Sequence, residues 1–178
     1  MSPGSFDFVF LKSVFTHMRP AGVEHYLREM RRVMKPGACC LATAFLLDQE
    51  SNQLIASGQS SLNLVHDLGG YQVLDPKFPE SAVGLPEASF KDWCEQANLI
   101  LELPLRYGSW CGRSRYLSYQ DIVLLRAPSL IPAFFHSCIP PNPLPAGAFK
   151  TCFLVNAPNS GKRGRHKSAI ISAVDKNF

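Results

Sequence analysis

Apolar residues along the first 50 positions change from a continuous run to a helical spacing and then back to a continuous run. The first run, Phe6–Leu11, is typical of a strand that is covered on both faces in a parallel sheet. The spacing that follows predicts an amphipathic helix that begins at Pro20 and is stopped by Pro36 and Gly37. The second run, Ala38–Leu47, predicts another buried strand. The pattern therefore predicts one right-handed parallel crossover in an open α/β sheet.

Three further elements follow in the sequence after a long connection. Glu50–Leu85 leaves the end of the second strand, and long loops at that end often shape a substrate site or a lid. A poorly ordered segment is the plainer interpretation. Ala88–Ala97 has apolar residues on one face of a predicted helix, and Leu99–Tyr107 and Tyr119–Arg126 are predicted strands.

An aromatic and basic cluster separates these last two strands. It is able to line a pocket for a flat or anionic substrate, but a hairpin that packs its own aromatic side chains is the interpretation we favour. The cluster contains Tyr107, Trp110, Arg113, Tyr116 and Tyr119. Asp121 follows it, and the sequence gives no physical reason for an acidic residue there.

The segment FDFVFLKSVFTHMRPAGVEHYLREMRRVMKPGACCLATAFLLD resembles the middle of a class I S-adenosylmethionine-dependent methyltransferase domain. In that family a strand, a short polar segment (here Ser13–His17) and a helix lead into a basic-Val-Leu-Lys-Pro-Gly-Gly sequence, which here reads Arg32–Ala38. RYGSWCGRSRYLSYQDIVLLR resembles the end of one methyltransferase subgroup. The resemblance covers about Phe6–Arg126. It implies a Rossmann-like doubly wound sheet of which this chain holds the second half only, with a closing antiparallel strand pair. An irregular C-terminal tail is expected after it, outside the resemblance.

This resemblance implies methyl transfer from S-adenosylmethionine to a small-molecule acceptor that the sequence does not identify. Lys12, Ser13 and Val14 would contact the cofactor, chiefly through the backbone; the alternative is an ordinary strand-to-helix loop. His17 is a weak candidate for a general base, because histidine is the side chain that most often acts as one, and a polar loop residue is the plainer interpretation. His66 is a weaker candidate still. No metal site is expected.

The first half of the family's domain carries most of the cofactor site: a glycine-rich turn and an acidic residue that binds the ribose. This chain contains no Gly-x-Gly sequence. We therefore expect a fragment of a longer product or a truncated relative, inactive in isolation. The alternative is a non-catalytic remnant that acts as a binding or assembly module. Without a neighbouring strand, Phe6–Leu11 would be an exposed apolar edge through which the chain self-associates.

Charge and proline content divide the chain near Pro128. Residues 1–127 carry 12 basic and 13 acidic residues, whereas residues 128–178 carry 6 basic and 1 acidic residue together with 7 of the 14 prolines. We expect a partial methyltransferase-like α/β domain over residues 1–127 and a disordered, proline-rich basic tail over residues 128–178. The basic run 161–167 lacks interleaved aromatic residues, so nucleic acid is not an expected partner. A role in nucleic-acid binding through this run ranks below both the methyltransferase and the non-catalytic module.

The six cysteines form no Cys-x-x-Cys pair. With no recognisable signal peptide, a reducing cytoplasm is the expected location. No apolar run approaches the roughly 20 residues of a membrane-spanning helix, so no membrane partner is expected.

Overall fold

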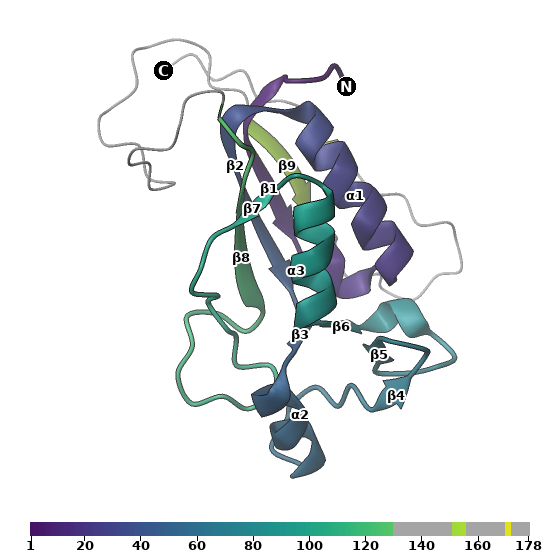
Figure 1. Ribbon diagram of the computed structural model, residues 1–178. Helices are drawn as coiled ribbons and strands as arrows, with labels where there is room; N and C mark the ends of the chain where they lie inside the picture. Colours follow the sequence, from purple (N-terminus) through teal and green to yellow (C-terminus); the bar gives the residue numbers. More distant parts are fainter. Residues whose placement is uncertain (130–150, 156–169, 172–178) are drawn as a thin grey trace.

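A six-stranded mixed sheet forms the body of the molecule. The computed structural model describes residues 1–129 and the backbone of two later strands, residues 151–155 and 170–171. The strand order is β10-β9-β1-β2-β8-β7 (Figure 1). The strands are β1 (Phe6–Lys12), β2 (Met34–Ala44), β7 (Ile100–Leu101), β8 (Asp121–Arg126), β9 (Thr151–Val155) and β10 (Ile170–Ile171).

The predicted parallel crossover is confirmed. β1 and β2 pair in parallel, and α1 (Pro20–Val33) connects them. Pro20 occupies the first helical turn, and the buried face of α1 consists of Val23, Leu27, Met30 and Val33. The helix ends before the Lys-Pro-Gly sequence, which forms the irregular start of β2: Gly37 has φ +77° and the β1–β2 register shifts between Phe6 and Phe8.

The predicted closing pair is also confirmed, because β7 and β8 are antiparallel and β8 is antiparallel to β2. The helix before them is α3 (Glu87–Gln96). Figure 1 shows α1 and α3 beside one another over the same face of the sheet. The Rossmann-like, partial α/β fold class predicted from the sequence is therefore the fold observed.

The long connection after β2 is folded rather than irregular. It contains α2 (Gln49–Ala56), and its short strands assemble in the order β3-β6-β5-β4. These strands are β3 (Leu46–Leu47), β4 (His66–Asp67), β5 (Gln72–Val73) and β6 (Val83–Pro86), with 3₁₀ turns η1 (Phe15–His17) and η2 (Pro79–Ser81) beside them. A second apolar cluster packs under this region, and at its centre Phe45 lies 5.2 Å from Trp110 between ring centres. Apolar contacts therefore order residues 45–86, although the sequence of this region has no helical or strand periodicity that would predict them.

The prediction of an exposed β1 edge is wrong for the chain described here. β9, from the C-terminal region, pairs in parallel with β1, so the backbone groups on that side of β1 have a partner strand. Sequence periodicity did not reveal this pairing because the two strands lie about 140 residues apart in the chain. The tail was predicted to be disordered, and β9 and β10 are strands within it. The other tail residues from 130 onward, including the basic run 161–167, lie outside the described residues.

Within the described residues, no helix is both long and apolar enough to cross a membrane. The predicted division into two parts at residue 127 stays a prediction.

Candidate functional site

Ser13 lies at the carboxyl edge of the main sheet, where β1 ends. Its φ of +56° is in the left-handed region, which residues other than glycine rarely adopt. The Ser13 amide donates to Thr43 Oγ1 of β2 at 2.8 Å, and its hydroxyl donates to Gln120 Oε1 at 3.1 Å. The loop after β1 is therefore held to β2 and to the residue before β8. Non-glycine residues in this conformation are enriched at functional sites.

The three residues predicted to contact a cofactor differ in their surroundings. Lys12 is exposed, whereas Ser13 is partly buried and Val14 packs partly buried against the main core. Because the Ser13 N–H already donates to Thr43, a ligand at this loop would have to contact other atoms of the segment. Contact of these three residues with a cofactor stays a prediction.

His17 follows this loop on η1. Its Nδ1 lies 2.9 Å from the carbonyl oxygen of Glu80, and a carbonyl only accepts hydrogen bonds, so Nδ1 carries the hydrogen. In the neutral ring Nε2 is then the proton acceptor. This geometry is compatible with a base, although its role stays a prediction.

His66 lies in the outermost strand of the small sheet and is exposed. The Asp67 carboxylate does not contact it in the described structure; instead it accepts from the amides of Gly69 and Gly70 at 2.8 and 3.1 Å. Successive residues of a strand point to opposite faces, so the structure does not bring this sequence-adjacent pair together.

Asp121, for which the sequence offered no explanation, is a fully buried hydrogen-bond hub. Its Oδ2 accepts from the Leu46 amide at 2.7 Å and from Trp110 Nε1 at 2.9 Å, and its Oδ1 accepts from the Gly108 amide at 2.6 Å. Burial raises the pKa of the Asp121 carboxyl group, while these three hydrogen bonds act in the opposite direction. The carboxylate joins β8, β3 and the loop between β7 and β8.

Arg113 extends this polar network toward α2. Its side chain is 4% exposed, and Nη2 lies 2.5 Å from Asp48 Oδ1 while Nε lies 3.0 Å from Glu50 Oε2. Nη1 is 4.0 Å from Asp121 Oδ1. The guanidinium also stacks 4.1 Å from the centre of the Tyr107 ring. One buried cation therefore joins two carboxylates at the start of α2 to the Asp121 carboxylate of β8.

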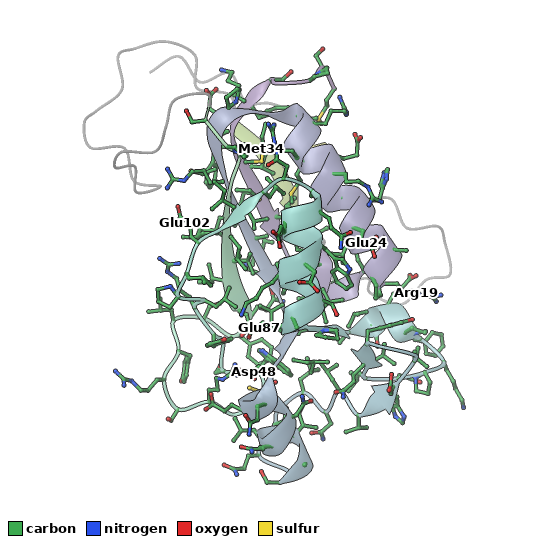
Figure 2. The ribbon with its side chains drawn as sticks, in the orientation of Figure 1. Arg19, Glu24, Met34, Asp48, Glu87 and Glu102 are labelled. Atoms are coloured by element: carbon green, nitrogen blue, oxygen red, sulfur yellow. The ribbon has the colours of Figure 1, made fainter. Side chains whose placement is uncertain are left out.

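The Tyr107 hydroxyl donates to Glu87 Oε2 at 2.8 Å, which fixes the start of α3 to the same loop. Burial, and then the Glu87 carboxylate, raise the pKa of Tyr107. Asp48 caps the N-terminus of α2 by accepting from the Ser51 amide. Figure 2 labels Asp48 at α2 and Glu87 at α3, both toward the end of the sheet from which β3 leaves.

The polar residues at this edge act mainly as a scaffold, since each described carboxylate of the network is already engaged. Of the aromatic and basic cluster predicted from sequence, Trp110 and Arg113 are buried, whereas Tyr116 and Tyr119 are exposed. The interpretation of a loop packing its own aromatics fits this arrangement. No group of three or more His, Cys, Asp or Glu side chains among the described residues could hold a metal ion.

Comparisons with known proteins agree with this architecture. Residues 1–42 match a family of methyltransferase domains. A S-adenosylmethionine-dependent methyltransferase from Methanosarcina mazei has a similar fold, with a TM-score of 0.50 and 16% identity over 72% of this chain and 62% of that protein. A protein from Pyrococcus horikoshii matches with a TM-score of 0.48 and 14% identity, over 72% of this chain and 54% of its own.

The fold and the carboxyl-edge loop define a partial Rossmann-like α/β domain. The resemblance to class I S-adenosylmethionine-dependent methyltransferases is confirmed, in sequence over residues 1–42 and in fold over most of the chain. The chain spans about 62% of the length of the Methanosarcina mazei structure that it matches.

Proposed function

We propose that this chain supplies the second half of a methyltransferase that moves a methyl group from S-adenosylmethionine to a small-molecule acceptor. The observation that carries the proposal is the placement of the Ser13 loop. It lies in the segment that matches methyltransferase domains, at the carboxyl ends of β1 and β2, where open α/β sheets bind their ligands.

In this proposal Lys12, Ser13 and Val14 form one wall of the cofactor site. Bound S-adenosylmethionine would supply an activated methyl group on its sulfonium, so the protein's main contribution is alignment of the acceptor with that group. His17 would use its Nε2 atom to accept a proton from the methyl acceptor. His66, exposed on the small sheet, is the weaker candidate for the same role.

The chain alone should bind the cofactor weakly and should not catalyse methyl transfer. It lacks the Gly-x-Gly turn, and a single wall supplies only part of the contacts of a complete site. We expect a dissociation constant of roughly 1 mM, which corresponds to about −4 kcal/mol.

Two threonine variants test whether the Ser13 loop is the binding wall. Thr43→Val removes the acceptor of the Ser13 amide, whereas Thr16→Val removes a buried hydroxyl that has no hydrogen-bond partner within the described structure. Equilibrium dialysis with S-adenosylhomocysteine should show about fivefold weaker binding for Thr43→Val, the equivalent of about 1 kcal/mol, and little change for Thr16→Val. Equal affinities for both variants and the parent chain would contradict the proposal.

The second candidate is a non-catalytic binding or assembly module. Pairing of β9 with β1 is compatible with a chain that folds without the first half of the domain, because the chain then covers its own apolar sheet edge. A cooperative unfolding transition with no detectable binding of S-adenosylhomocysteine would support this candidate over the first.

We also propose a cytoplasmic location. Support comes from the four described cysteines, Cys39, Cys40, Cys94 and Cys111, which are all free thiols.

A further inference from the structure

β1 has a strand on both of its sides. β2 pairs with one side, and β9 pairs with the other in five consecutive register positions, from Phe8 opposite Thr151 to Lys12 opposite Val155. The β1–β9 register contains no shift. Two residues of β10 then pair antiparallel with β9, so the outer edge of the sheet is a very short strand.

An unpaired β1 would be a liability for this chain. The strand is almost wholly apolar, and Val9 and Leu11 are buried. A flat apolar edge with free backbone groups is a template for pairing with another chain, and proteins commonly protect such edges with short outer strands. The β9–β10 arrangement has this form.

We propose that segment 151–155 is a self-complementing strand that docks on β1 of the same chain and completes the sheet. It occupies the side of β1 that the sequence alone predicts to be an exposed edge. The β1 edge is therefore a docking site for a parallel strand, and the occupant is the chain's own C-terminal region.

The length of the connection allows docking within one molecule. β8 is antiparallel to β2, so it ends near the start of β2, and β9 begins opposite Phe8 near the start of β1. The two points are three strand spacings apart, or about 15 Å at roughly 4.8 Å for each spacing. Residues 127–150 join them, and an extended chain covers about 3.3 Å for each residue, so the connection reaches easily.

The docking has consequences for both proposed functions. Self-association through β1 would first require withdrawal of β9. In addition, Val155 pairs with Lys12, so β9 holds the backbone at the start of the proposed cofactor-binding loop.

Hydrogen exchange of the full chain, with no ligand present, tests the proposal independently of methyl transfer. Successive amides of β1 point alternately toward β2 and toward β9. We expect all amides from Phe8 to Lys12 to exchange slowly, by more than about 100-fold relative to an unstructured chain. Alternation of slow and fast exchange along β1 would overturn the proposal.

A cysteine pair tests the register and the molecularity. Phe10 is opposite Phe153, so Phe10→Cys with Phe153→Cys should form a disulfide on mild oxidation, since paired residues lie within bridging distance. Phe10→Cys with Leu154→Cys is the matched control, because a one-residue shift moves the second thiol to the other face.

Mass spectrometry of the monomer fraction should find the Phe10–Phe153 cross-link at least about tenfold more often than the control cross-link. Equal yields, or a cross-link found only in dimers, would overturn docking within one chain. Failure of these variants to fold would leave the exchange experiment on the unmodified chain as the deciding measurement.

Discussion

Replacement of Asp121 by asparagine should destabilise the protein strongly, although the two side chains have nearly the same shape. The two carboxylate oxygens of Asp121 accept three hydrogen bonds, from Leu46, Gly108 and Trp110. Asparagine offers one oxygen and one NH₂ group. Whichever way the amide turns, at least one buried donor faces another donor.

An orphaned buried donor costs about 1–3 kcal/mol, and the remaining bonds weaken because their acceptor is no longer charged. Relief from burying the Asp121 charge, which raises its carboxyl pKa, offsets part of this loss. We therefore expect the free energy of unfolding to fall by about 2–4 kcal/mol. With a denaturant slope of about 2 kcal/mol/M, the urea midpoint should fall by about 1–2 M.

Urea unfolding followed by tryptophan fluorescence is a suitable assay, because Trp110 is fully buried and bonds to Asp121. Asp67→Asn is the matched control: Asp67 also accepts two backbone amides, but on the surface, where water replaces a lost partner. It should change stability by less than about 0.5 kcal/mol. If Asp121→Asn and Asp67→Asn shift the midpoint equally, the hub does not have the importance that we assign to it.

Three further outcomes follow from buried or partly buried groups. Gly108→Ala would bring Cβ into overlap with the Tyr119 carbonyl oxygen, so it should lower the free energy of unfolding by about 3 kcal/mol. Gly58→Ala, at an open position with positive φ, should lower it by about 1 kcal/mol. Similar losses for the two variants in urea unfolding would argue against close packing at Gly108. Burial raises the pKa of Cys94 to about 12, so an alkylating reagent at about pH 8 should not modify this thiol until urea unfolds the chain. Mass spectrometry would follow the modification, and rapid modification in the folded state would refute the burial of Cys94. The folded-state pKa of Tyr107 is raised above its ordinary value of 10.0, so its contribution to stability is complete below pH 10 and is lost as the pH rises further. The free energy of unfolding of Tyr107→Phe should therefore fall less steeply above about pH 10 than that of the parent chain. Equal slopes would contradict the raised pKa.

Much of the fold could be predicted from local patterns. Continuous apolar runs identified β1 and β2, and the helical stripe between them identified α1. These elements carry their own signals, because a strand covered on two faces and a helix covered on one impose different periods on the sequence. The likeness of residues 99–126 to the end of a methyltransferase domain likewise predicted the pairing of β7 with β8.

The candidate site was predicted only in part. The position of Lys12, Ser13 and Val14 at the carboxyl edge followed from the order of strand and helix. The network of Asp121 and Arg113 could not be predicted in this way. Two of the three donors to Asp121 are backbone amides, and residue type does not indicate which backbone amides will meet a carboxylate. A lone aspartate at the start of an apolar strand, and a lone arginine among aromatics, were the signals available.

Contacts between distant segments were the least predictable feature. The docking of β9 beside β1 depends on a five-residue strand in a proline-rich region, where composition favours disorder. The small sheet after β2 was similarly hidden, because its strands are two to four residues long and too short to establish a period.

The central claim, that the loop after β1 is the cofactor-binding wall of a methyltransferase half, is tested most directly by nuclear magnetic resonance. The backbone amides of the full chain would be followed while S-adenosylhomocysteine is added. We predict saturable shifts at Lys12, Ser13 and Val14, with a dissociation constant of roughly 1 mM, and no shifts in α1. Absence of shifts at these three residues in a folded chain, or saturable shifts centred elsewhere, would contradict the claim.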